Sequence, residues 1–416
     1  MIIQKQYNYS DRELVEQITE NPYYQYFIGL PGHQQEPPFA PSLLIEFRKR
    51  LTADIPGEIN EMIIEFNPPD DEPPADSTDA PDDESAENDA LAENKGTMML
   101  DATCAPHHIA FPQDINLLNE ARENPETIID TICYEYNAPK PRTYRRNARK
   151  DYLALAKKKK RTKKGIREAL KKQFQYVRRD IEYVDRFLTK GRELCPAHTA
   201  RLNVTRKVYE QQDYMYRNKT HKVPDRIVNI RQPYIRPIVK DKAKTPTEFG
   251  AKLDMSIDDH GMARIEKQSF DACNESDVLI GAIEGYHTRI GHYPERVLAD
   301  KIYRNRKNLK DCKEHGIRLS GPALGRPKKD PTEDRKIVYT DAVDRIEIKR
   351  DFSLAKRYYG LGLIRTKLDT TTRSSIRLSI IAMNVDRLTA VSLCDFLKSI
   401  FQSAWGGYPG MPLSSN

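Results

Sequence analysis

Two short apolar runs that end in aspartate constrain the fold of this chain more than any other feature. Met98 to Leu100 is followed by Asp101, and Arg296 to Ala299 is followed by Asp300, 199 positions further along. Each run has the length and apolar character of a buried strand. We expect the two strands to share one sheet, with both carboxylates at its carboxyl edge.

The length and composition are typical of a soluble protein with two or three domains. The chain has 416 residues, of which 38% are apolar and 31% are charged. No apolar run approaches the roughly 20 residues of a membrane span, and the first residues lack the pattern of a secretory signal. The six cysteines form no CxxC pair, so we expect reduced thiols, and oxygen ligands for any metal. We expect cytoplasmic residence and no membrane partner.

The charges are segregated along the chain. Residues 67–97 contain eleven acids and a single lysine, whereas residues 140–192 contain 21 Lys and Arg against five acids. The acidic segment is rich in proline and free of aromatic residues, which predicts a disordered linker. The basic segment points to a polyanionic partner.

Residues 1–66 are expected to form a small helical domain. Ser10 and Glu13 have the spacing of a capping box, and a second helix is expected over Ser42–Leu51. Between these helices lie four aromatic residues that we expect to pack in the domain core, with base stacking as the alternative: Tyr23, Tyr24, Tyr26 and Phe27.

Beyond Asp101 the apolar spacing changes between helical and strand periods. Helical spacing covers residues 114–136, and the basic segment 140–192 is expected to form a hairpin of two helices with one basic face. Period-two patterns predict strands at residues 226–230, 248–257 and 262–270. The remaining expected elements are a helix at 276–290, the strand before Asp300, a helix at 303–315, a short strand at 317–321, and helices at 332–360 and 370–403.

This order of elements resembles the RNase H-like α/β fold, and four segments resemble the DDE-type transposases of bacterial insertion sequences. Those segments are FIGLPGHQQEPPFAPSLLIEFRKRL, MMLDATCAPHHIAFPQDINLLNEAR, RVLADKIYRNRKNL and DRIEIKRDFSLAKRYYGLGLIRTKL. The resemblance implies four parts: a helical DNA-binding domain (1–66), the acidic linker (67–97), a DDE catalytic domain (98–403) with a basic helical insertion at about 113–192, and a flexible tail (404–416).

The resemblance also implies roles for individual residues. Asp101 and Asp300 would ligate divalent metal, with two Mg²⁺ or Mn²⁺ ions expected for phosphodiester chemistry. Arg345 and Lys356 would flank the third ligand and contact DNA phosphates. From their charge, we expect further DNA contacts from the lysine run Lys157, Lys158, Lys159 and Lys160, and from Arg48 and Arg50.

The third acid departs from the family pattern Tyr-x2-Arg-x3-Glu-x6-Lys. Ala342 stands at the tyrosine position and Lys349 at the glutamate position. A lysine there would pair with the two aspartates and compete with a metal ion. Glu347 is the alternative third acid, although it lies about 200° around a helix from Lys349.

Three functions remain open from the sequence. The first is an insertion-sequence transposase that binds terminal inverted repeats and target DNA as a homo-oligomer in the bacterial nucleoid, with metal-dependent hydrolysis and strand transfer weakened by Lys349. The second is a transposon-end-binding protein that does not cut. The third is a general nucleic-acid-binding protein.

Overall fold

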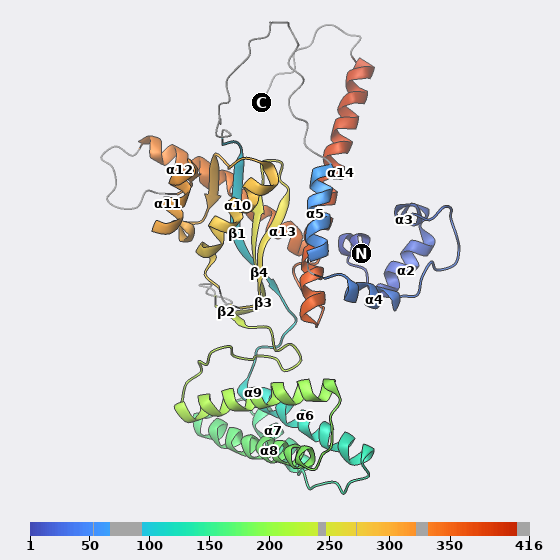
Figure 1. The fold of residues 1–416 in the computed structure, drawn as a ribbon, viewed down its shortest axis with the longest axis vertical. Coiled ribbons are helices and arrows are strands. Elements are labelled where there is room, and N and C mark those ends of the chain that lie inside the picture. Colours follow the sequence, from blue (N-terminus) through green and yellow to red (C-terminus); the bar gives the residue numbers. More distant parts are fainter. Residues whose placement is uncertain (53, 67–93, 240–246, 272, 322–331, 406–416) are drawn as a thin grey trace. The chain divides into compact units, whose positions relative to one another are not determined.

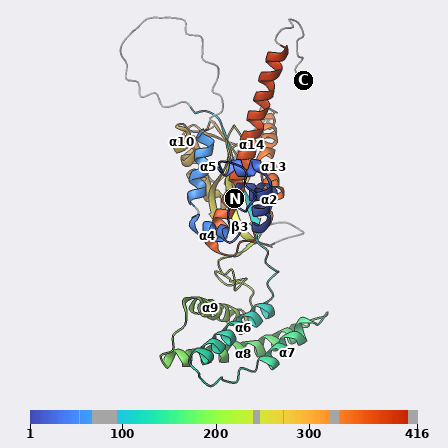
Figure 2. The same cartoon turned by 90° about the vertical axis from the view of Figure 1, so that its right-hand side faces the viewer.

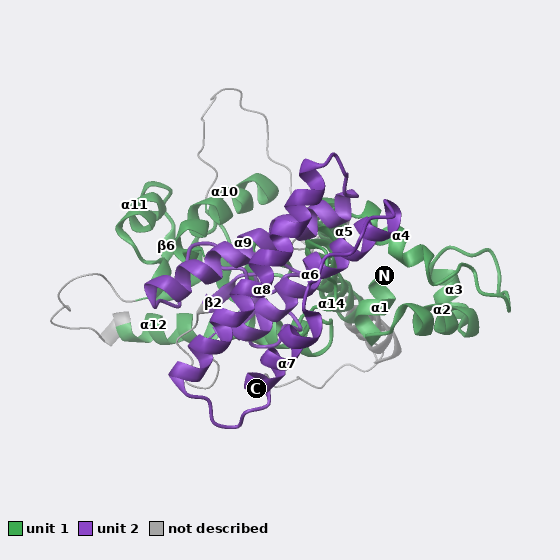
Figure 3. Cartoon of the chain, turned by 90° about the horizontal axis from the view of Figure 1, so that it is seen from below, with its two compact units in different colours: residues 1–106, 252–269, 273–416 green, residues 107–251, 270–272 purple. Residues whose placement is uncertain are grey.

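The computed structural model describes residues 1–52, 54–66, 94–239, 247–271, 273–321 and 332–405. Most of the acidic segment, and the tail from residue 406, lie outside the described residues. The chain forms two compact units, coloured separately in Figure 3. Unit 1 contains residues 1–106, 252–269 and 273–416, and unit 2 contains residues 107–251 and 270–272.

A mixed β-sheet forms the centre of unit 1 (Figure 1). Its strand order is β3-β1-β5-β6, with β4 paired to β3. β1, β5 and β6 run parallel, whereas β3 and β4 are antiparallel. The strands are β1 (Thr97–Pro106), β3 (Thr247–Ile257), β4 (Ala263–Ser269), β5 (Arg296–Ala299) and β6 (Arg318–Leu319). The expected α/β class is confirmed, and β5 ends immediately before Asp300 as expected. The expected end of the first strand at Asp101 is wrong, because β1 continues to Pro106.

One face of this sheet packs against α10 (Leu279–Ile290) and α11 (Arg306–Glu314). Alternate residues of β1 and β5, such as Met98 and Val297, point to this face because side chains alternate along a strand. A 3-10 turn, η1 (Glu275–Val278), leads into α10. These elements agree with the expected helices after β4 and after β5.

From residue 332 to residue 405 the chain forms three helices instead of the two expected. The helix expected over 332–360 is broken at Arg345 into α12 (Thr332–Asp344) and α13 (Ile346–Arg357). α13 packs against β1, and α14 (Asp369–Trp405) packs against β4 and the N-terminal helices. The break turns Arg345 toward the end of β5.

The N-terminal helices pack around the first part of α14 (Figure 2). Ser10 and Glu13 form the expected capping box at the start of α2. The helices are α1 (Ile2–Tyr7), α2 (Asp11–Glu20), α3 (Pro22–Phe27), α4 (Leu43–Arg50) and α5 (Asp54–Phe66). Leu14 and Ile18 of α2 are buried against Leu44 of α4.

The expected packing of the aromatic cluster is wrong for three of its four members. Tyr23, Tyr26 and Phe27 are 81%, 83% and 59% exposed. They lie at positions i, i+3 and i+4 of α3 and therefore share one face. Only Tyr24 packs against the helical core. The side chain of Gln25 is also buried, and its amide group donates hydrogen bonds to the carbonyls of Thr19 and Gln34.

Unit 2 is mainly helical. α7 (Arg145–Ala156) and α8 (Lys163–Thr189) form the expected hairpin, which packs with α6 (Asp114–Glu135) and with α9 (Pro196–Asn218), so the helices extend beyond the expected limit of residue 192. The strand expected at 226–230 is absent. Ile227 and Ile230 instead pack into the helical core. The short strand β2 (Pro237–Val239) pairs with the start of β3.

Two further observations concern the whole of the described chain. No described helix is long and apolar enough to cross a membrane. The five cysteines whose side chains are described are free thiols.

Candidate active site

The strand register makes Asp101 and Asp300 neighbours. Leu100 pairs with Ala299 in the parallel ladder between β1 and β5. Asp101 is the next residue of β1 and Asp300 directly follows β5, and neighbouring strands lie about 4.8 Å apart. The structure therefore brings together the two carboxylates that the sequence singled out.

Asp101 lies in a partly buried position on β1. Its carboxylate accepts a hydrogen bond of 2.8 Å from the backbone N–H of Ala102. Burial raises the pKa of Asp101 above its ordinary value, and the negative charge of Asp300 adds to this effect. The Ala102 N–H and the positive charges of Arg345 and Lys349 act in the opposite direction. Lys349 is therefore an electrostatic neighbour of the first aspartate.

Asp300 directly follows β5 and is the N-cap of the short 3-10 turn η2 (Lys301–Tyr303). Its carboxylate accepts a 2.7 Å hydrogen bond from the N–H of Lys301. One oxygen also lies 3.5 Å from Nη1 of Arg345, and the Asp300 side chain is half exposed. The carboxylate is thus held at the sheet edge with one side open to solvent.

Three basic residues form a stripe along α13. Arg345 stands at the N-cap, and Lys349 and Lys356 follow at intervals of four and seven residues. Such intervals return to one face of a helix. Nη1 of Arg345 donates a 3.1 Å hydrogen bond to the carbonyl of Ala299. The guanidinium therefore connects the start of α13 with the end of β5.

Glu347 faces another environment. Its charge raises the pKa of Asp351, a carboxylate that burial already raises. Asp351 is fully buried and accepts a hydrogen bond of 2.7 Å from Arg387 on α14. The positive charge of Lys349 lowers the pKa of Asp101 although the Lys349 side chain is exposed. Glu347 lies one turn before Asp351 on α13.

Asp101 and Asp300 are the two carboxylates that could hold a cation at this site. Among the described residues, no group of three or more His, Cys, Asp or Glu side chains is arranged to hold a metal ion. Two aspartates at one sheet edge nevertheless suit Mg²⁺, which proteins commonly hold through one or two carboxylates and the phosphates of the substrate.

Comparison with known protein families adds two matches. Residues 1–50 match the family model described as Transposase domain (DUF772), and residues 297–386 match the model described as Transposase DDE domain. The second match includes Asp300, Arg345 and Lys349. The chain belongs to the DDE-type transposases of insertion sequences. No curated protein and no solved structure matches it.

A buried carboxylate on β3 of this transposase escaped the sequence analysis. Asp254 is fully buried, and neither of its carboxylate oxygens has a hydrogen-bond partner among the described residues. Burial raises its pKa to about 6, with further increases from Glu275 and Asp101. The alternation of β3 predicted a strand here, but nothing local indicated an acid in the interior.

The residues expected to contact DNA differ in whether they are exposed or bonded within the transposase. Arg48 donates to Asp11 and Gln4, which ties α4 to α1 and α2. Arg50 is exposed at the end of α4. The lysine run 157–160 is exposed in the turn between α7 and α8.

His107 directly follows β1 and does not lie on the surface. Its ring is buried in unit 2, with edge-on contacts to Tyr234 and Phe270. His108, the next residue, is exposed. Adjacent residues point in opposite directions near the end of a strand, so only one of the two histidines reaches solvent.

Proposed function

We propose that this transposase binds the terminal inverted repeats of its element and cleaves phosphodiesters with Asp101 and Asp300 as metal ligands. The observation that supports this most directly is the pairing of Leu100 with Ala299, which makes the two aspartates neighbours. A bound divalent ion would act as a Lewis acid and would activate water or a 3′ hydroxyl for hydrolysis and strand transfer. An element has two ends, so we propose action as a homo-oligomer.

The chain's own residues would prepare this site in two ways. Arg345 holds the end of β5 through the Ala299 carbonyl and limits the movement of Asp300. Burial of Asp101 lowers the dielectric around its carboxylate, which strengthens attraction to a cation. Lys356, two turns after Lys349 on the same stripe, would contact a DNA phosphate, which is the role its family position implies.

We propose that Lys349 keeps cleavage weak. Its ammonium group favours the ionised form of Asp101, and it repels any cation that approaches the same carboxylate. The position also lacks the oxygen donor that a second metal ion needs. The protein would therefore bind DNA ends well and cut them poorly.

The test is a strand-nicking assay on the element's terminal repeats with Mg²⁺ or Mn²⁺. We expect little cleavage by the wild type and a gain of at least about tenfold for Lys349→Glu, since the change removes a repelling charge and adds a ligand. Lys349→Gln, which removes the charge alone, should give a smaller gain. No gain from Lys349→Glu in a protein that still binds the ends would contradict the proposed role of Lys349.

Glu347 remains the alternative third ligand. It would reach the aspartates only if the start of α13 shifted in register, because its present neighbour is Asp351. Full cleavage by the wild type, abolished by Glu347→Gln and unaffected by Lys349→Gln, would identify Glu347 as the metal-binding acid.

The second candidate function is a transposon-end-binding protein without nuclease activity, which the lysine at position 349 favours. Selective binding of terminal repeats combined with no cleavage by either the wild type or Lys349→Glu would support it. Equal affinity for terminal repeats and random duplexes would instead indicate a general nucleic-acid-binding protein.

A further inference from the structure

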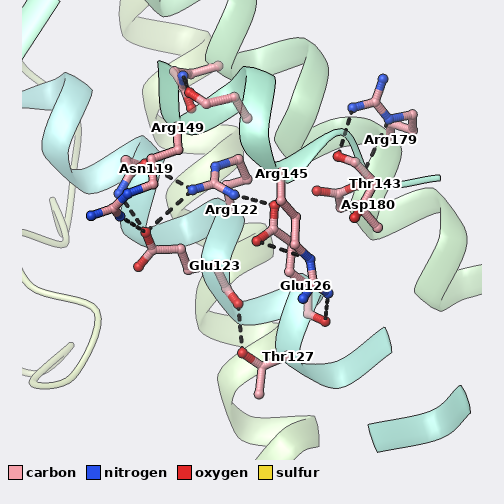
Figure 4. Close-up of polar contacts among 12 residues, drawn as sticks. Asn119, Arg122, Glu123, Glu126, Thr127, Thr143, Arg145, Arg149, Arg179 and Asp180 are labelled. Carbon is pink, nitrogen blue, oxygen red and sulfur yellow. Dashed lines mark hydrogen bonds and ion pairs between the residues drawn. The ribbon is translucent and has the colours of Figure 1, made fainter. Parts of the chain in front are cut away.

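The basic residues of α7 fall into two groups that the sequence does not distinguish. Arg145 and Arg149 lie on the side of α7 that faces α6 (Figure 4). Arg146 and Lys150 lie about 100° further around the helix. The two groups therefore differ in their partners.

The first group is neutralised by acids of α6. Arg145 donates to both carboxylate oxygens of Asp130, at 2.5 and 2.8 Å, and to the carbonyl of Glu126 at 2.6 Å. Arg149 lies 3.8 Å from Glu123. The three acids recur at intervals of three and four residues along one face of α6. The contacts of Arg145 hold α7 on α6, whereas Arg149 remains 64% exposed beside Glu123.

The second group, together with Arg149, lines an open groove of about 640 Å³ on α7. At 100° per residue, Arg146, Lys150 and Lys157 lie within about 40° of one another, and at 1.5 Å per residue they span about 17 Å. Lys158 extends the row, and Leu153 and Ala154 line the groove between the charges. The groove is therefore a straight row of cations with small apolar surfaces between them.

No described carboxylate forms an ion pair with any of these four cations. The carboxylates nearby are already engaged: Asp151 with Lys172 at 3.0 Å, and Glu126 with Arg122. Four neighbouring positive charges repel one another, which is unfavourable without an external anion. An anion that carries charges at regular intervals along a line fits this arrangement better than a single phosphate or carboxylate.

We propose that this groove binds the phosphate backbone of one DNA strand, without regard to base sequence, through Arg146, Lys150, Lys157 and Lys158. The inference rests on the proposed function, since it assigns the DNA contacts of a DNA-acting protein to one face of one helix. A length of about 17 Å matches about five nucleotides at 3.4 Å of helix axis per phosphate of one strand. Neutral apolar side chains between the cations suit backbone contact and offer no hydrogen bonds to bases.

The surface is narrower than the lysine run that the sequence suggested. Lys157 and Lys158 line the groove, whereas Lys159 and Lys160 do not. Lys150 and Arg146 take their place, about two and three turns before Lys157. We therefore expect changes at Lys159 and Lys160 to affect binding less than changes at Arg146 and Lys150.

The test measures duplex affinity at several salt concentrations for the full chain in EDTA, so that cleavage plays no part. In one variant the four cations proposed to contact DNA are changed to Gln. The matched control changes four exposed cations of the same unit that lie outside the groove, namely Arg201, Lys207, Lys219 and Lys222. Both variants lose four charges, so they have the same net charge.

We expect the groove variant to flatten the dependence of log K on log salt by up to about 0.9 for each DNA phosphate that the protein no longer neutralises, a total of up to about 3.6. The control should retain nearly the wild-type slope. Equal slopes in the two variants would overturn the proposal, because net charge alone would then explain binding. Wild-type protein that binds no DNA would instead refute the proposed function.

The variant Arg145→Gln tests whether Arg145 stabilises the fold without contacting DNA. Because Arg145 bonds to Asp130 and Glu126, this variant should lower the melting temperature and leave the salt slope of the folded protein unchanged. A flattened slope in Arg145→Gln at temperatures where it is folded would contradict the division of α7 into two groups.

Discussion

Arg345 lies 3.5 Å from the Asp300 carboxylate while it donates to the carbonyl of Ala299, the residue before Asp300. One guanidinium thus contacts both the backbone and the side chain at the end of β5. Because Arg345 is also the N-cap of α13, this contact sets where the helix begins relative to the sheet. The position of Lys349, four residues later, follows from it.

Arg345→Ala should lower the free energy of unfolding by about 1 kcal/mol, because it removes a hydrogen bond from a charged group at a partly exposed site. Urea titration measures the change. Arg357→Ala, at the exposed end of the same helix, should change stability by less than about 0.5 kcal/mol. Equal effects of the two variants would show that the contact with Ala299 contributes nothing.

Lys349→Glu should raise the pKa of Asp101 further in metal-free protein. The ammonium group that lowers this pKa is removed, and a negative charge takes its place. A carbon-detected NMR titration of labelled aspartate side chains measures the shift, and Lys349→Gln should give a smaller shift in the same direction. An unchanged Asp101 titration in both variants would mean that Lys349 points away from the site.

Asp254→Asn should stabilise the protein at neutral pH. The pKa of Asp254 is about 6 in the folded protein and about 3.9 in the unfolded chain. The wild-type protein therefore loses stability as the pH rises from about 4 to 6, because the buried carboxyl must give up its proton. At 1.36 kcal/mol per pKa unit, the gain at pH 8 is up to about 3 kcal/mol. Thermal unfolding of both proteins at several pH values measures this gain, which should vanish near pH 4. A gain that is independent of pH would show that charge at Asp254 is not the cause.

Tyr23→Ser and Tyr26→Ser should change the free energy of unfolding by less than about 0.5 kcal/mol, since both rings are exposed. Tyr24→Ala should cost about 2 kcal/mol, because its ring packs against the core of the N-terminal helices. Chemical denaturation of the three variants compares them. A large loss from Tyr26→Ser would indicate that α3 packs against a part of the protein that covers this face.

Elements with strong local signals were predictable from the sequence. The capping box at Ser10 and the two-residue period of β3 and β4 are decided by neighbouring residues, so the structure agrees with both. The proximity of Asp101 and Asp300 was predictable because each directly follows an apolar run, and the two runs pair in parallel, although β1 continues beyond Asp101.

Features that depend on distant partners were not predictable. Tyr23 and Tyr26 were expected inside because local spacing cannot show which face of α3 meets the core. The residues around Ile227 alternate like a strand, yet they pack on helices of unit 2. Asp254 lacks a hydrogen-bond partner among the described residues because of how β3 is packed. Arg145 is paired with Asp130 because of how α7 packs against α6.

The place where unit 2 joins the chain has a consequence for how such proteins diversify. The N–H of His107, at the start of the unit, donates a 2.8 Å hydrogen bond to the carbonyl of Phe249, near its end. The first and last residues of an insertion of about 140 residues therefore lie side by side. A gene can gain, lose or exchange such a module by two breaks at a single spot, and the strands on either side keep their pairing.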